Sequence, residues 1–231
     1  MNKLMSVVVV TFACVQVYAA SEGSLSMDLA KPGSSSSNRL DKSFTLLASP
    51  IGLGPSQNAE AGLVAGIFIS PKTLIQLEAG DGNTSEGFSF FGTSTVKSHT
   101  SSASIAIKHF VGNSFYVKGG VDNRRINYSE SYKSTWNLFG TPSTYEDNVT
   151  FEAESWSASV VIGNQWQWEN FTLGCDWVGI AAPFTSEVKS ESYATTSTDK
   201  TSIQRDLADR EKRKLKDMAF QGLKFYLGAS F

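Results

Sequence analysis

The sequence predicts an all-β fold, an eight-stranded antiparallel β-barrel whose strands follow one another up and down. Three observations lead to this prediction. Apolar and polar residues alternate with period two in eight segments, the connections between segments are alternately short and long, and the charged residues of these segments share one face. An even number of strands with tight turns on one side and longer loops on the other is the plan of an up-and-down barrel.

Residues 1–19 are interpreted as a cleaved signal peptide. Lys3 is the only charged residue before an apolar run at 4–17, and Val17 and Ala19 provide small side chains where a signal peptidase reads them, so cleavage is expected near Ala19. A single-pass anchor is the alternative, but the run is shorter than the roughly 20 residues that span a bilayer. A lipoprotein cut before Cys14 would divide the apolar run. The sequence therefore predicts export.

Charge and cysteine content limit the partners and the cofactors. Removing Lys3 from the 20 basic residues leaves 19, against 22 acidic residues, and gives a formal charge of −3, which does not indicate a nucleic-acid partner. Only Cys175 remains after processing, so no internal disulfide is expected. Two histidines and one lone cysteine offer no metal-site spacing, and no glycine-rich phosphate motif is present. We therefore expect no metal and no cofactor.

Residues 20–41 are small and polar, and we interpret them as a flexible lead-in with nothing to bury. The barrel is expected to occupy residues 42–231. Its first strand should end at Pro50, because proline and the glycines that follow interrupt a strand. Strands are expected at 42–49, 59–69, 75–80, 103–108, 115–124, 155–163, 171–177 and 223–231. Tight turns are expected at 70–73, 112–113 and 164–170, and long polar loops at 81–102, 127–150 and 183–217.

The two faces of the strands differ in a way that indicates a membrane barrel. One face is apolar and nearly free of charge, whereas a soluble sandwich would carry more charge on its outward positions. Lipid outside and a polar interior give the observed pattern. The interior of eight strands is just wide enough for side chains to fill, so its charged residues should pair with one another. We expect a lumen network that plugs the barrel, with a narrow ion or solute path as the alternative. Its members are Glu78, Lys108, Lys118, Asp122, Arg124, Asp176 and Lys224.

The last strand, 223–231, alternates apolar and mostly polar or small residues and ends on Phe231. This ending resembles the last strand of bacterial outer-membrane β-barrels, in which a terminal phenylalanine after alternating apolar residues is an assembly signal. Phe225, Leu227 and Phe231 would form that signal here. With it, residues 42–231 resemble small outer-membrane barrels such as the OmpA transmembrane domain, OmpX and opacity-type proteins.

The resemblance implies a location in the bacterial outer membrane. The lead-in and the tight turns would be periplasmic and the long loops extracellular. Its implied partners are outer-membrane lipid and lipopolysaccharide, the barrel-assembly machinery, and an extracellular ligand that contacts the loops. The implied role is non-enzymatic, either structural or in adhesion and ligand contact. A narrow channel and a lipid-modifying outer-membrane enzyme are the alternatives.

Aromatic residues toward the strand ends predict two interfacial girdles. The expected periplasmic girdle contains Phe44, Phe115, Trp166, Trp168, Phe171, Phe225 and Phe231. The expected outer girdle contains Phe88, Phe90, Phe91, Tyr128 and Trp136.

A basic segment lies within the longest predicted loop. Its helical spacing allows a short exposed helix or a strand arm. A solvated loop face is one interpretation, and contact with phosphates of lipopolysaccharide is the other, because clustered Arg and Lys suit such groups. The basic residues are Arg205, Arg210, Lys212, Arg213, Lys214 and Lys216.

His99 and Ser101 stand two residues apart at the outer end of the fourth predicted strand. The pair resembles the His-x-Ser of the lipid A deacylase family, which a glutamate completes. At the offset of that acid this chain has the turn near Asn113, so no orienting carboxylate is expected. The sequence therefore predicts no catalytic residue and no enzyme activity.

Overall fold

The computed structural model describes residues 34–53, 59–89, 93–138, 141–195 and 203–231. Eight strands form one closed sheet in which each strand pairs antiparallel with the next, and the last strand pairs with the first. The predicted eight-stranded, up-and-down barrel is confirmed. The strands are β1 (Phe44–Leu53), β2 (Ala59–Ser70), β3 (Thr73–Ser89), β4 (Thr93–Phe110), β5 (Phe115–Leu138), β6 (Thr141–Trp168), β7 (Phe171–Thr195) and β8 (Ala219–Ser230).

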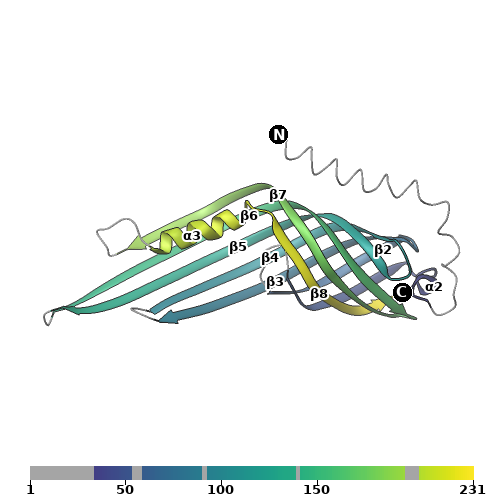
Figure 1. Cartoon of the computed structure of the whole chain (residues 1–231), viewed down its shortest axis with the longest axis horizontal. Helices are drawn as coiled ribbons and strands as arrows, with labels where there is room; N and C mark the ends of the chain where they lie inside the picture. Colours follow the sequence, from purple (N-terminus) through teal and green to yellow (C-terminus); the bar gives the residue numbers. More distant parts are fainter. Residues whose placement is uncertain (1–33, 54–58, 90–92, 139–140, 196–202) are drawn as a thin grey trace.

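The barrel has a compact end and a long end (Figure 1). Tight turns join β2 to β3, β4 to β5 and β6 to β7 at the compact end. At the other end β5, β6 and β7, with 24, 28 and 25 residues, run far beyond β1 and β8, with 10 and 12. We call the parts of β3 to β7 that reach past β1, β2 and β8 the extension. It comprises residues 82–89, 93–100, 126–138, 141–153 and 182–195.

The three predicted long loops are wrong for most of their residues. The β3–β4 register continues to Ser89 opposite Thr93, and the β5–β6 register to Leu138 opposite Thr141. The third region continues β7 to Thr195 and then forms the helix α3 (Ile203–Lys214), so the helix that was one prediction for the basic segment is confirmed. The β5–β6 part pairs as strands because its inward face carries apolar residues that are buried, while its polar outward face meets water.

Two predicted details at the start of the barrel are also corrected. β1 does not end before Pro50 but continues to Leu53, and its register with β2 shifts between Ser49 and Gly52. A proline is tolerated there because an irregularity leaves a residue outside the ladder.

The predicted lead-in with nothing to bury is wrong for residues 34–41. They include the short helix α2 (Ser35–Asn38), and Ser35, Ser36 and Arg39 are buried. Figure 1 places α2 at the compact end, close to the C-terminus. The predicted signal peptide and the rest of the lead-in, residues 1–33, lie outside the described residues.

Buried side chains divide the interior into three zones. Near the compact end, an apolar cluster includes Leu47, Phe68, Leu74 and Phe110. A second apolar cluster lies in the extension and includes residues of α3. Between them the barrel interior is polar and charged. Neither α2 nor α3 has the length and apolar character that a membrane-spanning helix requires.

Candidate functional site

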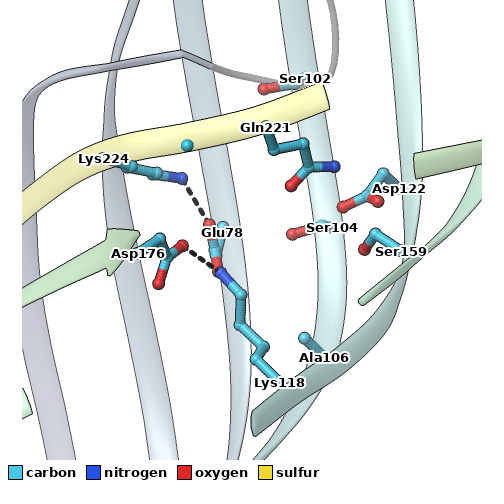
Figure 2. A pocket seen from close by; sticks show the side chains of 11 residues that line it. Glu78, Ser102, Ser104, Ala106, Lys118, Asp122, Ser159, Asp176, Gln221 and Lys224 are labelled. Atoms are coloured by element: carbon cyan, nitrogen blue, oxygen red, sulfur yellow. Dashed lines mark hydrogen bonds and ion pairs between the residues drawn. The ribbon is translucent and has the colours of Figure 1, made fainter. Parts of the chain in front are cut away.

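The polar zone of the lumen is centred on Lys118 of β5. Its Nζ lies 2.7 Å from Glu78 Oε1 on β3 and 2.6 Å from Asp176 Oδ2 on β7, and all three side chains are buried. Lys224 of β8 forms a further ion pair with Glu78. Figure 2 shows Lys118 and Lys224 converging on Glu78 from different strands. The structure thus brings four of the seven predicted lumen residues into one charge network that crosses the barrel.

Uncharged partners outside the predicted set of lumen residues continue this network. Tyr116 hydrogen-bonds Asp176, and its hydroxyl lies 2.5 Å from that of Tyr226. Lys108 donates to Tyr226 and to Gln165 Oε1, both at 3.0 Å, instead of meeting an acidic residue. Its ammonium also lies 4.2 Å from the centre of the Tyr116 ring. Tyr116 is two residues from Lys118, and Tyr226 is two residues from Lys224, so each tyrosine points to the same face as the lysine. This spacing could have identified both tyrosines from the sequence.

The remaining predicted lumen residues, Asp122 and Arg124, are buried on inward positions of β5 beyond Gly120. Arg124 donates to Ser155 Oγ at 3.4 Å. Asp122 lines a cavity of about 20 Å³ together with Gln221, and one carboxylate oxygen of Asp122 has no hydrogen-bond partner in the described chain. A space of this size holds about one water molecule. The described side chains therefore fill the lumen at this level.

The compact end is covered by α2 and the residue that follows it. Arg39 Nε donates to Pro71 O at 2.9 Å, and its guanidinium stacks 3.9 Å above the Phe110 ring. Ser36 N donates to Asn113 Oδ1 at 2.9 Å, and Asn38 Nδ2 to Gln167 O at 2.7 Å. These contacts connect the α2 segment to the β2–β3 turn, the β4–β5 turn and the end of β6. Burial lowers the pKa of Arg39 to about 10, so its side chain remains charged at neutral pH.

In the extension α3 packs on the inward face of β5 and β6. Ala208 and Leu215 are buried against a cluster that contains Ile126, Tyr128, Val149, Phe151 and Ala153. The Tyr128 and Phe151 rings are stacked with centroids 5.0 Å apart. The prediction that Tyr128 belongs to an outer girdle is therefore wrong, because this ring points into the extension. The side chains of Phe88, Phe90, Phe91 and Trp136 lie outside the described residues.

Lys212 attaches α3 to β7. Its Nζ lies 2.5 Å from Glu191 Oε1, 2.9 Å from Tyr193 Oη and 3.2 Å from Asp209 Oδ1. Partial burial alone would lower the pKa of Lys212, but hydrogen bonds to these three groups raise it above its ordinary value. The predicted basic segment thus divides into an internal anchor and an outer set.

Arg210, Arg213 and Lys216 form that outer set, and all three are exposed. Each side chain lies at the surface of the extension, on α3 or just after it. The side chains of Arg205 and Lys214 lie outside the described residues.

The outward face of the strands changes character at the base of the extension. On β5 it passes from Val121 to Arg125, and on β6 from Trp156 to Glu154. The inward face changes in the opposite sense at the same level, from Arg124 to Ile126. The outward charges form weak pairs, with Glu154 3.9 Å from both Arg125 and Lys189. β5 and β6 therefore each invert their alternation once along their length.

His99 lies in this outward polar zone. Its Nδ1 is 2.8 Å from Asn83 Oδ1 and its Nε2 is 3.4 Å from Asp81 Oδ1. The expectation of no carboxylate near His99 is corrected, because the neighbouring strand supplies Asp81. Both ring nitrogens are engaged by these groups, and within the described chain Ser101 makes no hydrogen bond to His99. A nucleophile activated by a histidine requires that bond.

Aromatic residues at the compact end pack in pairs that join strand ends. Phe44 and Phe231 stack at 5.3 Å, and Trp168 and Phe171 at 6.0 Å. Phe231 N donates to Phe44 O at 2.8 Å and Phe44 N to Phe231 O at 2.9 Å, so the predicted pairing of the last strand with the first is confirmed. Phe225 and Leu227 of the predicted assembly signal face outward and are exposed.

In the described part of the chain, no group of three acidic, His or Cys side chains could hold a metal ion.

Fold and lumen together define an eight-stranded β-barrel filled by a buried polar network. Among solved structures, CarO2 of Acinetobacter baumannii is similar, with a TM-score of 0.50 and 12% identity over 81% of this chain and 98% of that chain. CarO of the same organism has a TM-score of 0.47 and 12% identity, covering 84% and 98%. No protein-family model matches the sequence, and no curated protein matches it. At this identity the likeness concerns the fold alone.

Proposed function

We propose that this chain is a bacterial outer-membrane protein with a closed barrel, belongs to the small outer-membrane barrels, and has a non-enzymatic role carried by the extension on the cell surface. The observation that carries this proposal is the inversion of the alternation along single strands. An apolar outward face needs lipid, and a polar outward face over an apolar core needs water. The inversion at Arg125 and Glu154 would therefore mark the outer boundary of the bilayer.

The apolar belt supports the membrane location. Ile67 is 65% exposed, Ile105 54% and Phe220 68%, and comparable side chains occur on all eight strands. Soluble monomers rarely expose contiguous apolar patches larger than a few hundred Å². The belt lies between the compact end and the base of the extension. In the proposed orientation the tight turns face the periplasm and the extension lies outside the cell.

The filled lumen supports a closed barrel over a channel. The network of Glu78, Lys118, Asp176 and Lys224 crosses the interior, the remaining cavity has room for about one water molecule, and α2 covers the compact end. Opening a path would require breaking buried ion pairs, which is strongly unfavourable. The geometry of His99 supports a role other than lipid hydrolysis, because its two nitrogens are engaged by Asp81 and Asn83.

Conductance measurements test the closed barrel. The purified protein, reconstituted in planar bilayers, should give no stepwise current above the lipid background. The control is the same preparation after heat denaturation, which reports adventitious leaks. Regular single-channel steps from the folded protein that are absent from the denatured sample would establish a channel and overturn this part of the proposal.

Surface labelling tests the orientation. In a Cys175→Ser background, Lys133→Cys in the extension should react with a membrane-impermeant maleimide on intact cells. Asp41→Cys, an exposed position beside α2, should react only after the outer membrane is permeabilised. Outer-membrane fractionation and heat-modifiable gel mobility should accompany this result. A protein found in the soluble periplasmic fraction without a mobility shift would overturn the location.

A further inference from the structure

The exposed side of α3 carries a pair of arginines on a helix whose opposite side is fixed. Ala208 packs into the apolar cluster of the extension, and Lys212 bonds Glu191 and Tyr193 of β7. At about 100° per residue, Ala208 and Lys212 lie on one side of the helix, and Arg210 and Arg213 lie on the other. The packing that buries α3 therefore directs both arginines outward.

Arg210 and Arg213 differ from the cations that anchor this region in having no internal side-chain partner. Within the described chain the guanidinium group of neither arginine makes a hydrogen bond or an ion pair, whereas the side chains of Lys212, Arg125 and Lys189 each do. Three residues apart on a helix, the two guanidinium groups are neighbours, and Lys216 is exposed just beyond the helix end. Cations near a helix C-terminus also complement the helix dipole. That electrostatic effect leaves the N–H donors of the two guanidinium groups available to an external anion.

The height of α3 limits which anion can reach these groups. The proposed outer boundary lies at Arg125 on β5, and Tyr128, which packs in the same cluster as α3, is three residues further along the strand. At about 3.3 Å per residue the helix then lies roughly 10 Å above the outer boundary of the bilayer. The saccharide part of lipopolysaccharide occupies this zone. The charged groups at the boundary itself, Arg125 and Lys189, already pair with Glu154.

We propose that Arg210 and Arg213 bind phosphate groups on the core saccharide of lipopolysaccharide. This inference rests on the proposed outer-membrane location and names the partner of the extension. Guanidinium groups bind phosphate through two parallel hydrogen bonds, and two of them on adjacent helical positions fit a phosphorylated sugar better than a single charge does. Lys212 takes no part, because its donors are used in holding α3.

The test measures binding of purified lipopolysaccharide to the folded, detergent-solubilised full chain. The variant is Arg210→Gln with Arg213→Gln, and the matched control is Lys97→Gln with Lys133→Gln, which removes two exposed charges elsewhere on the extension. Binding of lipopolysaccharide with core phosphates should weaken about tenfold or more in the arginine variant, and by less than about twofold in the control.

A second ligand separates the two phosphate sources. A preparation that lacks core phosphates but keeps those of lipid A should bind the unchanged protein as weakly as it binds the arginine variant. Equal affinity of the unchanged protein for both preparations, or equal loss in both charge variants, would overturn the inference. Surface labelling of Arg213→Cys on cells reports the location of α3 independently of binding. If this variant is labelled on cells but the unchanged protein does not bind lipopolysaccharide, the binding inference is wrong and the proposed location stands.

Discussion

The barrel and the extension are built from the same strands with opposite patterns. In the barrel, β5 directs Lys118 and Asp122 inward and Val121 outward. In the extension, the same strand directs Ile126 and Tyr128 inward, and at the base of the extension it directs Arg125 outward. One region is polar inside and apolar outside, and the other is the reverse. The difference indicates that the solvent around each region, and not the strand itself, determines which face is apolar.

The two regions are consequently stabilised by different means. The barrel is closed by strand pairing and filled by ion pairs that are costly to break one partner at a time. The extension is an open sheet covered on one face by α3, as in a soluble domain, so apolar burial stabilises it. Changes in one region should therefore leave the other largely intact.

The largest expected effect is on barrel closure. Deleting Phe231 removes the backbone bonds to Phe44 at 2.8 and 2.9 Å and the ring stack that joins the last strand to the first. Folded protein in the outer membrane should fall severalfold, because closure of the sheet and the proposed assembly signal fail together. Heat-modifiable mobility of membrane fractions measures it. Deleting residues 203–214, which form α3, is the comparison and should leave the barrel assembled.

The next effect concerns the lumen. Glu78→Ala leaves Lys118 and Lys224 without their shared carboxylate, and removing one partner of a buried ion pair costs about 3–5 kcal/mol. Urea unfolding in lipid vesicles should show this loss for the whole barrel. Ser104→Ala, which changes a side chain lining the same cavity, is the control and should cost much less. Equal stability of Glu78→Ala and the unchanged protein would contradict the network.

A smaller and local effect is expected in the extension. Leu215→Ala removes a side chain that is 2% exposed and packs with Tyr128 and Phe151. Such truncations cost about 2–5 kcal/mol. The loss should appear as faster hydrogen exchange and proteolysis of α3, with an unchanged urea midpoint for the barrel. A parallel shift of both regions would show that they unfold as one unit.

The alternation in the sequence predicted the strands of the barrel but not their continuation into the extension, and there is a physical reason for this difference. The apolar residues of β6 fall on even numbers from Trp156 to Ile162, and this phase predicted the strand and its outward face. Below Trp156 they fall on odd numbers, at Val149, Phe151 and Ala153. The sequence prediction starts this strand at Ser155 and places a long polar loop at 127–150. The change of phase is the inversion of one continuous strand, and the signal is present in the sequence.

The partners of the lumen charges were less predictable than their location. Inward phase alone placed Glu78 and Lys118 in the interior. The stagger of the strands around the barrel and the length of each side chain determine which cation pairs with which acid. The alternation of apolar and polar residues gives no information about either. Lys108 thus meets Tyr226 and Gln165 where an acidic partner was predicted. The covering of the compact end by Arg39 could not be predicted from a periodic pattern, because the segment that carries Arg39 is short and polar.

The smallest expected effect separates the anchor of α3 from its exposed face. Lys212→Met keeps most of the apolar side chain but removes its bonds to Glu191, Tyr193 and Asp209, which for a partly exposed cation amounts to about 1 kcal/mol. Hydrogen exchange of α3 should accelerate about fivefold at neutral pH. Arg213→Met, on the exposed face, should leave the exchange unchanged.

The same variant gives a pH test of known sign. Because the pKa of Lys212 is raised in the folded protein, its contribution is complete below the ordinary lysine value of about 10.4 and is lost as the pH rises through the higher folded value. The difference in α3 exchange between the unchanged protein and Lys212→Met should therefore be constant around neutral pH and disappear in strong alkali. A difference that grows with rising pH would show that Lys212 does not hold α3 through its charge.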